Sequence, residues 1–238
     1  LGNPTARISI AMTVVSGTGL FGIIVYVPAT AQMAFGMAAT PAGLILFPMV
    51  LGMVATSIMV GNVISRSGRY RPYPITGGVV GFIALGGAAL LSRDNSVWFI
   101  VLALVIAGIG VGFFGQLAVI LTQASAPPEQ LGGATSLVAI IREIGGSIGA
   151  AGFGALFSTK LVHGLAGISL PSGITVHSIG PLDLPKLDDS MRAAVADAYF
   201  GAMHPVFQTS AAINVLALML AVALPTVVLK THLAEEVA

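Results

Sequence analysis

One long stretch without charged side chains constrains this chain more than any other feature of its sequence. From Ile8 to Ser65 there is no Asp, Glu, Lys or Arg. A helix needs about 20 largely apolar residues to cross the hydrocarbon core of a bilayer, so this stretch is long enough for more than one crossing. We therefore expect a membrane protein rather than a water-soluble domain.

The composition of the whole chain agrees with lipid as its solvent. Of 238 residues, 56% are hydrophobic and 8% are charged, whereas soluble proteins carry about 25% charged residues. The formal net charge of +1 gives no reason to expect a nucleic-acid partner. The chain has no Cys, which excludes disulfides and thiolate metal sites. Its His residues show no metal-ligand spacing, so we expect neither a metal nor a cofactor.

Breaks in the apolar pattern divide the chain into six expected membrane spans. Gly and Pro interrupt the first long stretch at Gly36–Pro41, and a cluster of Arg residues ends the second span. The expected spans cover residues 8–35, 42–63, 73–91, 98–121, 131–158 and 206–229. The fold class that follows is an all-α polytopic membrane protein, a six-helix bundle over residues 1–238.

A long polar connection, residues 160–203, precedes the last of these spans. Its first part is rich in Gly, Pro, Ser and His and is typical of a loop. From Ser190 on, apolar residues recur at helical spacing, which predicts a short interfacial helix over 190–202. We expect a bend at His204-Pro205 to separate this helix from the last span.

The distribution of positive charge predicts the orientation of the bundle. Short loops rich in Lys and Arg stay in the cytoplasm, and Arg66, Arg69 and Arg71 form such a loop. Six spans place both ends of the chain on that same side. We expect Arg69 and Ala234 to face the cytoplasm and the long connection to lie outside.

The loop Gly61–Arg71 is the first candidate functional motif. Gly at a helix end lets two helices approach closely, and neighbouring Arg side chains can donate hydrogen bonds to carbonyls at helix C-termini. One interpretation is a set of cations that only fixes topology. The other is a conformational latch between helix bundles, formed by Gly61, Arg66, Gly68 and Arg69.

The pattern Gly-x-x-x-(Asp)-Arg-x-Gly-Arg in this loop resembles the cytoplasmic signature of the major facilitator superfamily. Further motifs, in order and spacing, resemble the C-terminal half of its fourteen-span drug:proton antiporters: Tyr26-Val27-Pro28, Ala42-Gly43-Leu44, Gly108-x-Gly110-x-Gly112, Gly132–Ser136 and Arg142–Gly149. Two positions depart from the family pattern. Ser65 replaces the usual Asp, and Glu143 replaces the Gln that usually follows Arg142.

The resemblance implies that a second, N-terminal six-helix bundle lies on the same or a companion polypeptide, with substrate bound between the bundles. The start at Leu1, without Met or a signal peptide, agrees with a piece of a longer chain. The implied function is export of hydrophobic or cationic compounds in exchange for protons across the bacterial inner membrane. The alternatives are a metabolite or lipid exporter of the same fold, or a non-transporting scaffold or sensor. No ATPase phosphate loop or intramembrane protease motif occurs in the sequence, and we do not expect an enzyme.

Two charged residues fall inside the fifth expected span, Arg142 and Glu143. Counted from Pro128, Arg142 lies roughly 20 Å along the helix, near the middle of the bilayer, where an Arg costs about 2.5–3.5 kcal/mol on insertion scales. We expect such a residue to be paired with a carboxylate or carbonyl and to take part in proton coupling. If that carboxylate does not carry the proton, Glu143 is the fallback proton carrier. The alternative is an Arg142 side chain that extends to the interface with Glu143 as its counter-ion.

Several aromatic and amide side chains within the spans suit a cavity for bulky apolar cations. The alternative for each is ordinary packing or an interhelical hydrogen bond. The candidates for the substrate cavity are Phe21, Tyr26, Gln32, Phe113, Phe114 and Gln116.

Overall fold

A computed structural model describes residues 4–124, 127, 130–168, 175 and 179–225. Helices are the only regular elements in this part of the chain. In chain order these are α1 (Pro4–Phe35), α2 (Ala39–Leu44), α3 (Phe47–Ser67), α4 (Pro72–Ala88), α5 (Val97–Ala124), α6 (Leu131–Leu165), the 3₁₀ helix η2 (Pro181–Lys186) and α7 (Asp189–Val222). The predicted all-α fold is confirmed.

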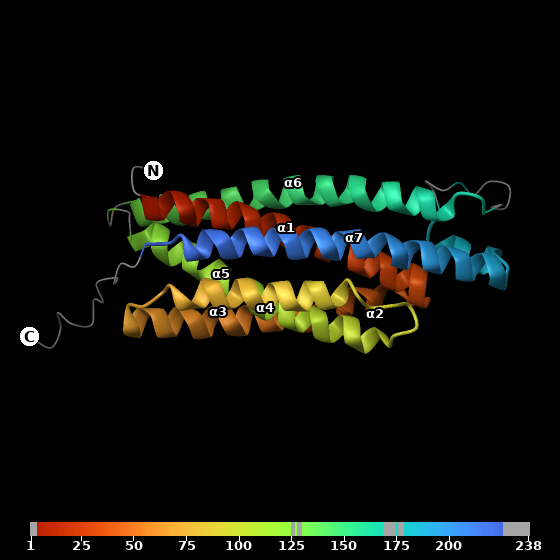
Figure 1. Cartoon of the computed structure of the whole chain (residues 1–238), viewed down its shortest axis with the longest axis horizontal. Helices are drawn as coiled ribbons and strands as arrows, with labels where there is room; N and C mark the ends of the chain where they lie inside the picture. The colour runs from red at the N-terminus through yellow and green to blue at the C-terminus, as the bar shows by residue number, and fades with distance from the viewer. Residues whose placement is uncertain (1–3, 125–126, 128–129, 169–174, 176–178, 226–238) are drawn as a thin grey trace, which may run out of the picture.

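The long helices form an elongated bundle, and their long axes run roughly along its length (Figure 1). Helix α1 packs against α5, α6 and α7, whereas α5 packs against α3 and α4 and also reaches α6. The start of α1 and the end of α7 lie at the same end of the bundle (Figure 1). We call this the terminal end, and we call the opposite end, near η2, the outer end.

Two glycines with positive φ lie at the ends of the second span. Gly36, with φ +64°, follows α1 and lets the chain turn back toward α2. Gly68, with φ +65°, closes α3, and its N–H donates to the carbonyl of Ile64. Only glycine adopts such a φ without strain, and a left-handed residue at this place satisfies a carbonyl that the helix end leaves free.

Five of the helical segments are long and apolar enough to cross a membrane. These are Arg7–Phe35, Ala39–Ser67, Val97–Gln123, Leu131–Leu165 and Asp189–Val222. A sixth apolar helix, α4, is shorter, with 17 residues, or about 25 Å at 1.5 Å per residue.

The prediction for the last span was wrong in one respect. Residues 190–202 do not form a separate short helix, because α7 continues through Pro205 to Val222. Residues 226–229 of the predicted span lie outside the described residues. Pro205 removes one backbone hydrogen bond, but Met203 and Val206 on either side of it are buried in the core. Packing on both sides stabilises the helix across the proline, as membrane helices commonly allow.

The polar connection is also shorter than predicted, because α6 extends to Leu165 and α7 begins at Asp189. The Asp188 side chain accepts a hydrogen bond from the Met191 N–H at 2.7 Å and so caps α7. This bond, together with one from the Ser190 hydroxyl, holds the pKa of Asp188 below its ordinary value.

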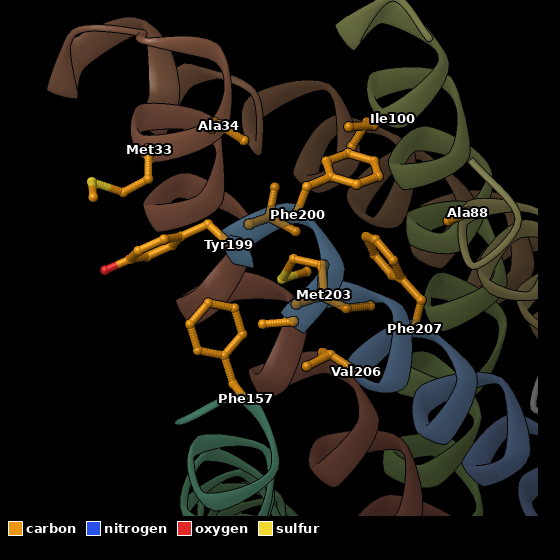
Figure 2. Close-up of a cluster of buried hydrophobic side chains, with 14 of the residues drawn as sticks. Met33, Ala34, Ala88, Ile100, Phe157, Tyr199, Phe200, Met203, Val206 and Phe207 are labelled. Carbon is orange, nitrogen blue, oxygen red and sulfur yellow. The ribbon is translucent and has the colours of Figure 1, made fainter. Parts of the chain in front are cut away.

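An aromatic cluster joins α1, α6 and α7, and Figure 2 shows Phe157 and Tyr199 of this cluster among other buried side chains. The ring of Phe157 stacks on Tyr26 at 4.8 Å between centroids and meets Tyr199 edge-on at 5.9 Å. The Tyr199 hydroxyl donates to the backbone carbonyl of Ile179 at 3.1 Å. The cluster therefore connects the interior of the bundle to the segment before η2.

Candidate functional site

Arg142 lies on α6, 11 residues after Leu131, or about 16 Å along the helix. Its side chain is half-buried, and Nη2 donates to the backbone carbonyl of Gly115 on α5 at 3.4 Å. No carboxylate forms an ion pair with it among the residues that the structure describes. The guanidinium is thus held by a carbonyl, while its charge is not neutralised in this part of the chain.

Glu143 is exposed and does not pair with Arg142 in the described ranges. Successive side chains on a helix point about 100° apart, so the two charges leave α6 in different directions. Glu143 shares the exposed side of α6 with Ile140, Ile144 and Ile148, all more than half exposed. A carboxylate thus lies in an apolar face that no described residue covers.

The surface of α5 beside Arg142 is built from glycine. A side chain added at Gly115 would begin 3.8 Å from Arg142 Nη2 and 4.0 Å from the hydroxyl oxygen of Ser57 on α3. The Ser57 hydroxyl donates to the carbonyl of Gly112 at 3.1 Å. Three helices therefore bring polar groups to one place. Sequence reasoning did not single out Ser57, although a hydroxyl within an apolar span was a signal.

The signature pattern is followed, within the same loop, by a residue that contacts another helix of the same bundle. Arg66 and Arg69 are exposed, and Gly68 closes α3 as described above. Arg71 Nη2 donates to the carbonyl of Val222 at the end of α7 at 3.1 Å. An Arg of this loop therefore donates to a carbonyl at a helix C-terminus. The residue that does so is Arg71, and not Arg66 or Arg69.

Tyr70 reinforces this contact. It is almost fully buried, and its hydroxyl donates to the carbonyl of Pro225. We call Tyr70 and Arg71 the α7 clasp. The clasp joins the loop between α3 and α4 to the last helix, a contact that the order of motifs in the sequence does not reveal.

The candidate cavity residues do not gather around one cavity. On α1, Phe21 packs against Gly146, and the Tyr26 hydroxyl donates to the carbonyl of Ala150 at 3.4 Å, so both side chains face α6. Gln32 bonds within its own helix, to the carbonyl of Pro28 at 3.3 Å.

The α5 candidates also point to different places. Phe113 stacks on Tyr73 of α4 at 6.4 Å, and Phe114 is buried in the core. The side chain of Gln116 lies outside the described residues. An open cleft of about 720 Å³ does exist at the outer end, but of the six candidates only Gln32 lines it; Met37, Leu184 and Arg192 are among the other lining residues.

Comparison with known proteins identifies the family. The model of the Major Facilitator Superfamily matches residues 2–150. This chain belongs to the Major Facilitator Superfamily. An uncharacterized MFS-type transporter of Mycobacterium tuberculosis is 32% identical over 94% of this chain, which covers 33% of that relative. The chain thus spans about a third of the length of this mycobacterial relative.

Two further relatives of this superfamily member have names that refer to drugs. The tetracycline resistance determinant of Streptomyces rimosus is 35% identical over 61% of this chain and 42% of its own length. The multidrug transporter protein MdtP of Bacillus subtilis is 33% identical over 60% of this chain and 26% of its own length.

A solved structure shows the same fold. A bacterial homolog of the human lysosomal transporter Spinster, in an inward-facing and occupied conformation, aligns with a TM-score of 0.73 at 16% identity. The alignment covers 94% of this chain and 49% of that protein. The chain therefore has half of a major facilitator fold, and it is part of a multi-pass membrane protein.

Proposed function

We propose that this chain is the C-terminal bundle of a proton-coupled exporter of hydrophobic or cationic compounds. Membership of the superfamily and the names of the drug-resistance relatives support this proposal. The bundle works by alternating access with an N-terminal six-helix bundle on the same or a companion polypeptide. It lies in a bacterial inner membrane with both ends in the cytoplasm.

The observation that supports the proposal most is the presence of two charged residues, Arg142 and Glu143, in the middle of α6. Glu143 is exposed among apolar side chains, and an ionised group in contact with lipid is costly. This side of α6 is therefore the face that meets the second bundle or the water between the bundles. A carboxylate there can take up a proton in one conformation and release it in the other, while Arg142 favours the ionised form of any nearby carboxylate.

Substitutions of the two charges test this role in the full-length transporter. Arg142→Ala, Arg142→Lys and Glu143→Gln are compared at equal membrane levels, with Arg93→Ala at the outer end as a control for loss of a cation. Drug efflux and the accompanying proton movement are measured in proteoliposomes.

We expect Arg142→Ala to lose coupled transport and Arg93→Ala to keep it. Loss in Glu143→Gln, with drug binding retained, assigns the transported proton to Glu143. Full coupled transport by Arg142→Ala contradicts the proposal.

A further inference from the structure

We infer that Ser57, Gly115 and Arg142 form a binding site for a carboxylate group, which we call the carboxylate site. The inference rests on the proposed function in one respect, namely that this side of α3, α5 and α6 faces the second bundle and the transported compound. It adds a chemical class to that function. The site favours a ligand group that is anionic, although the compounds exported by the proposed transporter include cations.

Helix α5 has no side chain of its own beside the Arg142 guanidinium. Helix α5 packs against both α3 and α6, and it presents Gly115, which has no side chain, beside Arg142 and Ser57. A single methyl group at position 115 would only touch these two side chains, at 3.8 and 4.0 Å. A larger side chain would extend into the space that a ligand group would need.

The hydrogen bonds of Arg142 are far from complete. A guanidinium has five N–H donors, and the described residues supply one acceptor, the carbonyl of Gly115, at the long distance of 3.4 Å. The side chain is half-buried in the middle of a membrane helix, where an unneutralised charge is unfavourable. An anion with several acceptor atoms would neutralise this charge and complete these hydrogen bonds.

A carboxylate fits this site better than other ligand groups. Its two oxygens match the fork of the guanidinium and accept two parallel hydrogen bonds. The Ser57 hydroxyl donates to the carbonyl of Gly112 in α5. Because a hydroxyl can rotate, it can donate to an oxygen of the carboxylate instead. A metal ion is excluded by the positive charge of Arg142, and phosphate head groups of lipids lie at the membrane surface rather than at this depth.

Two sources supply the same chemistry. The carboxylate belongs either to an Asp or Glu of the second bundle or to the transported compound itself. Equilibrium binding distinguishes them when two dyes are compared, a cationic xanthene dye with a free benzoic acid group and the methyl ester of the same dye. The full-length transporter is purified in nanodiscs, and the dissociation constant of each dye is measured from pH 5 to pH 9.

Arg142→Gln is the main variant. A loss of about tenfold or more in affinity for the acid dye, with the ester unchanged, identifies the transported compound as the source. An equal loss for both dyes, together with loss of the pH dependence of ester binding, identifies a carboxylate of the second bundle. Unchanged binding of both dyes, or an equal loss with the pH dependence intact, would overturn the inference.

Glycine variants keep the inference testable if Arg142→Gln does not fold. Gly115→Val fills the site and is expected to reproduce the effect of Arg142→Gln. Gly87→Val on α4, where a side chain meets nothing within 4 Å, controls for valine in a membrane helix. Wild-type binding by Gly115→Val would also overturn the inference. The binding assay uses no proton gradient, so it is independent of proton coupling. A transporter that binds the acid dye through Arg142 but does not exchange protons would refute the proposed function and leave the carboxylate site standing.

Discussion

The contact between α1 and α6 at Gly149 is so close that a single methyl group should weaken it. A Cβ atom at position 149 would overlap the backbone oxygen of Thr18 and lie 2.8 Å from its Cα, whereas ordinary contact begins at 3.4 Å. Because these are backbone atoms, no change of rotamer relieves the overlap and the helices must separate. Separation also stretches the bond from the Thr18 hydroxyl to the carbonyl of Gly145, which is 3.0 Å long.

The expected net loss of stability in Gly149→Ala is about 1–4 kcal/mol, after the gain of up to about 1 kcal/mol in helix propensity is subtracted. Overpacking of a core costs about 1–3 kcal/mol, and a weakened hydrogen bond adds about 1 kcal/mol. Gly152→Ala is the matched control, since Gly152 lies on the same helix and an added Cβ meets nothing within 4 Å. Alanine there gains up to about 1 kcal/mol of helix propensity.

Thermal unfolding of the purified full-length transporter in detergent measures this difference. The fraction that stays monodisperse after heating gives a midpoint temperature for each variant. We expect Gly149→Ala to have a lower midpoint than the wild type and Gly152→Ala to have an equal or higher one. Equal midpoints for the two variants would refute the close contact between α1 and α6.

Three further predictions concern the two ends of the bundle. A single Cys at Arg69 should resist an impermeant thiol reagent in intact cells, and a single Cys at Leu182, in η2, should react; the opposite pattern would invert the topology. Hydrogen bonds lower the pKa of Asp188 in the folded protein below its ordinary value of 3.8. The charged cap therefore stabilises the first turn of α7 fully above pH 3.8, and this stabilisation is lost as the pH falls through the lowered pKa. Hydrogen exchange of this turn should therefore accelerate below about pH 4 in the wild type and be fast at every pH in Asp188→Ala. Tyr70→Phe should lower the stability by about 1–2 kcal/mol and speed exchange at the end of α7, whereas Tyr73→Phe, whose ring stacks on Phe113, should not.

Most of the fold follows from local sequence, because the length of apolar segments and the position of glycines determine where membrane helices end. The turn at Gly36–Pro41 was predicted, and the structure has it at residues 36–38. Pro205 was misread because its effect depends on tertiary packing. A proline that ends a helix in water is tolerated where buried side chains hold the helix on both sides.

The candidate site follows from the sequence less completely. An Arg in the middle of an apolar span is costly wherever it lies, so Arg142 stands out without a structure. Its contact with Gly115 and the nearness of Ser57 depend on how α3, α5 and α6 pack, and no local pattern encodes that packing. The same holds for Arg71, since its role arises only when the end of α7 is placed beside the loop.

The central claim, export driven by protons, is tested most directly by imposing a pH gradient on the reconstituted full-length transporter. A cationic fluorescent drug and the internal pH of the proteoliposomes are followed together, without ATP. The account predicts that the drug moves against its own gradient while protons move the opposite way, and that an uncoupler which collapses the pH gradient stops both. Drug movement that the uncoupler does not change, or proton movement that the drug does not affect, would contradict it.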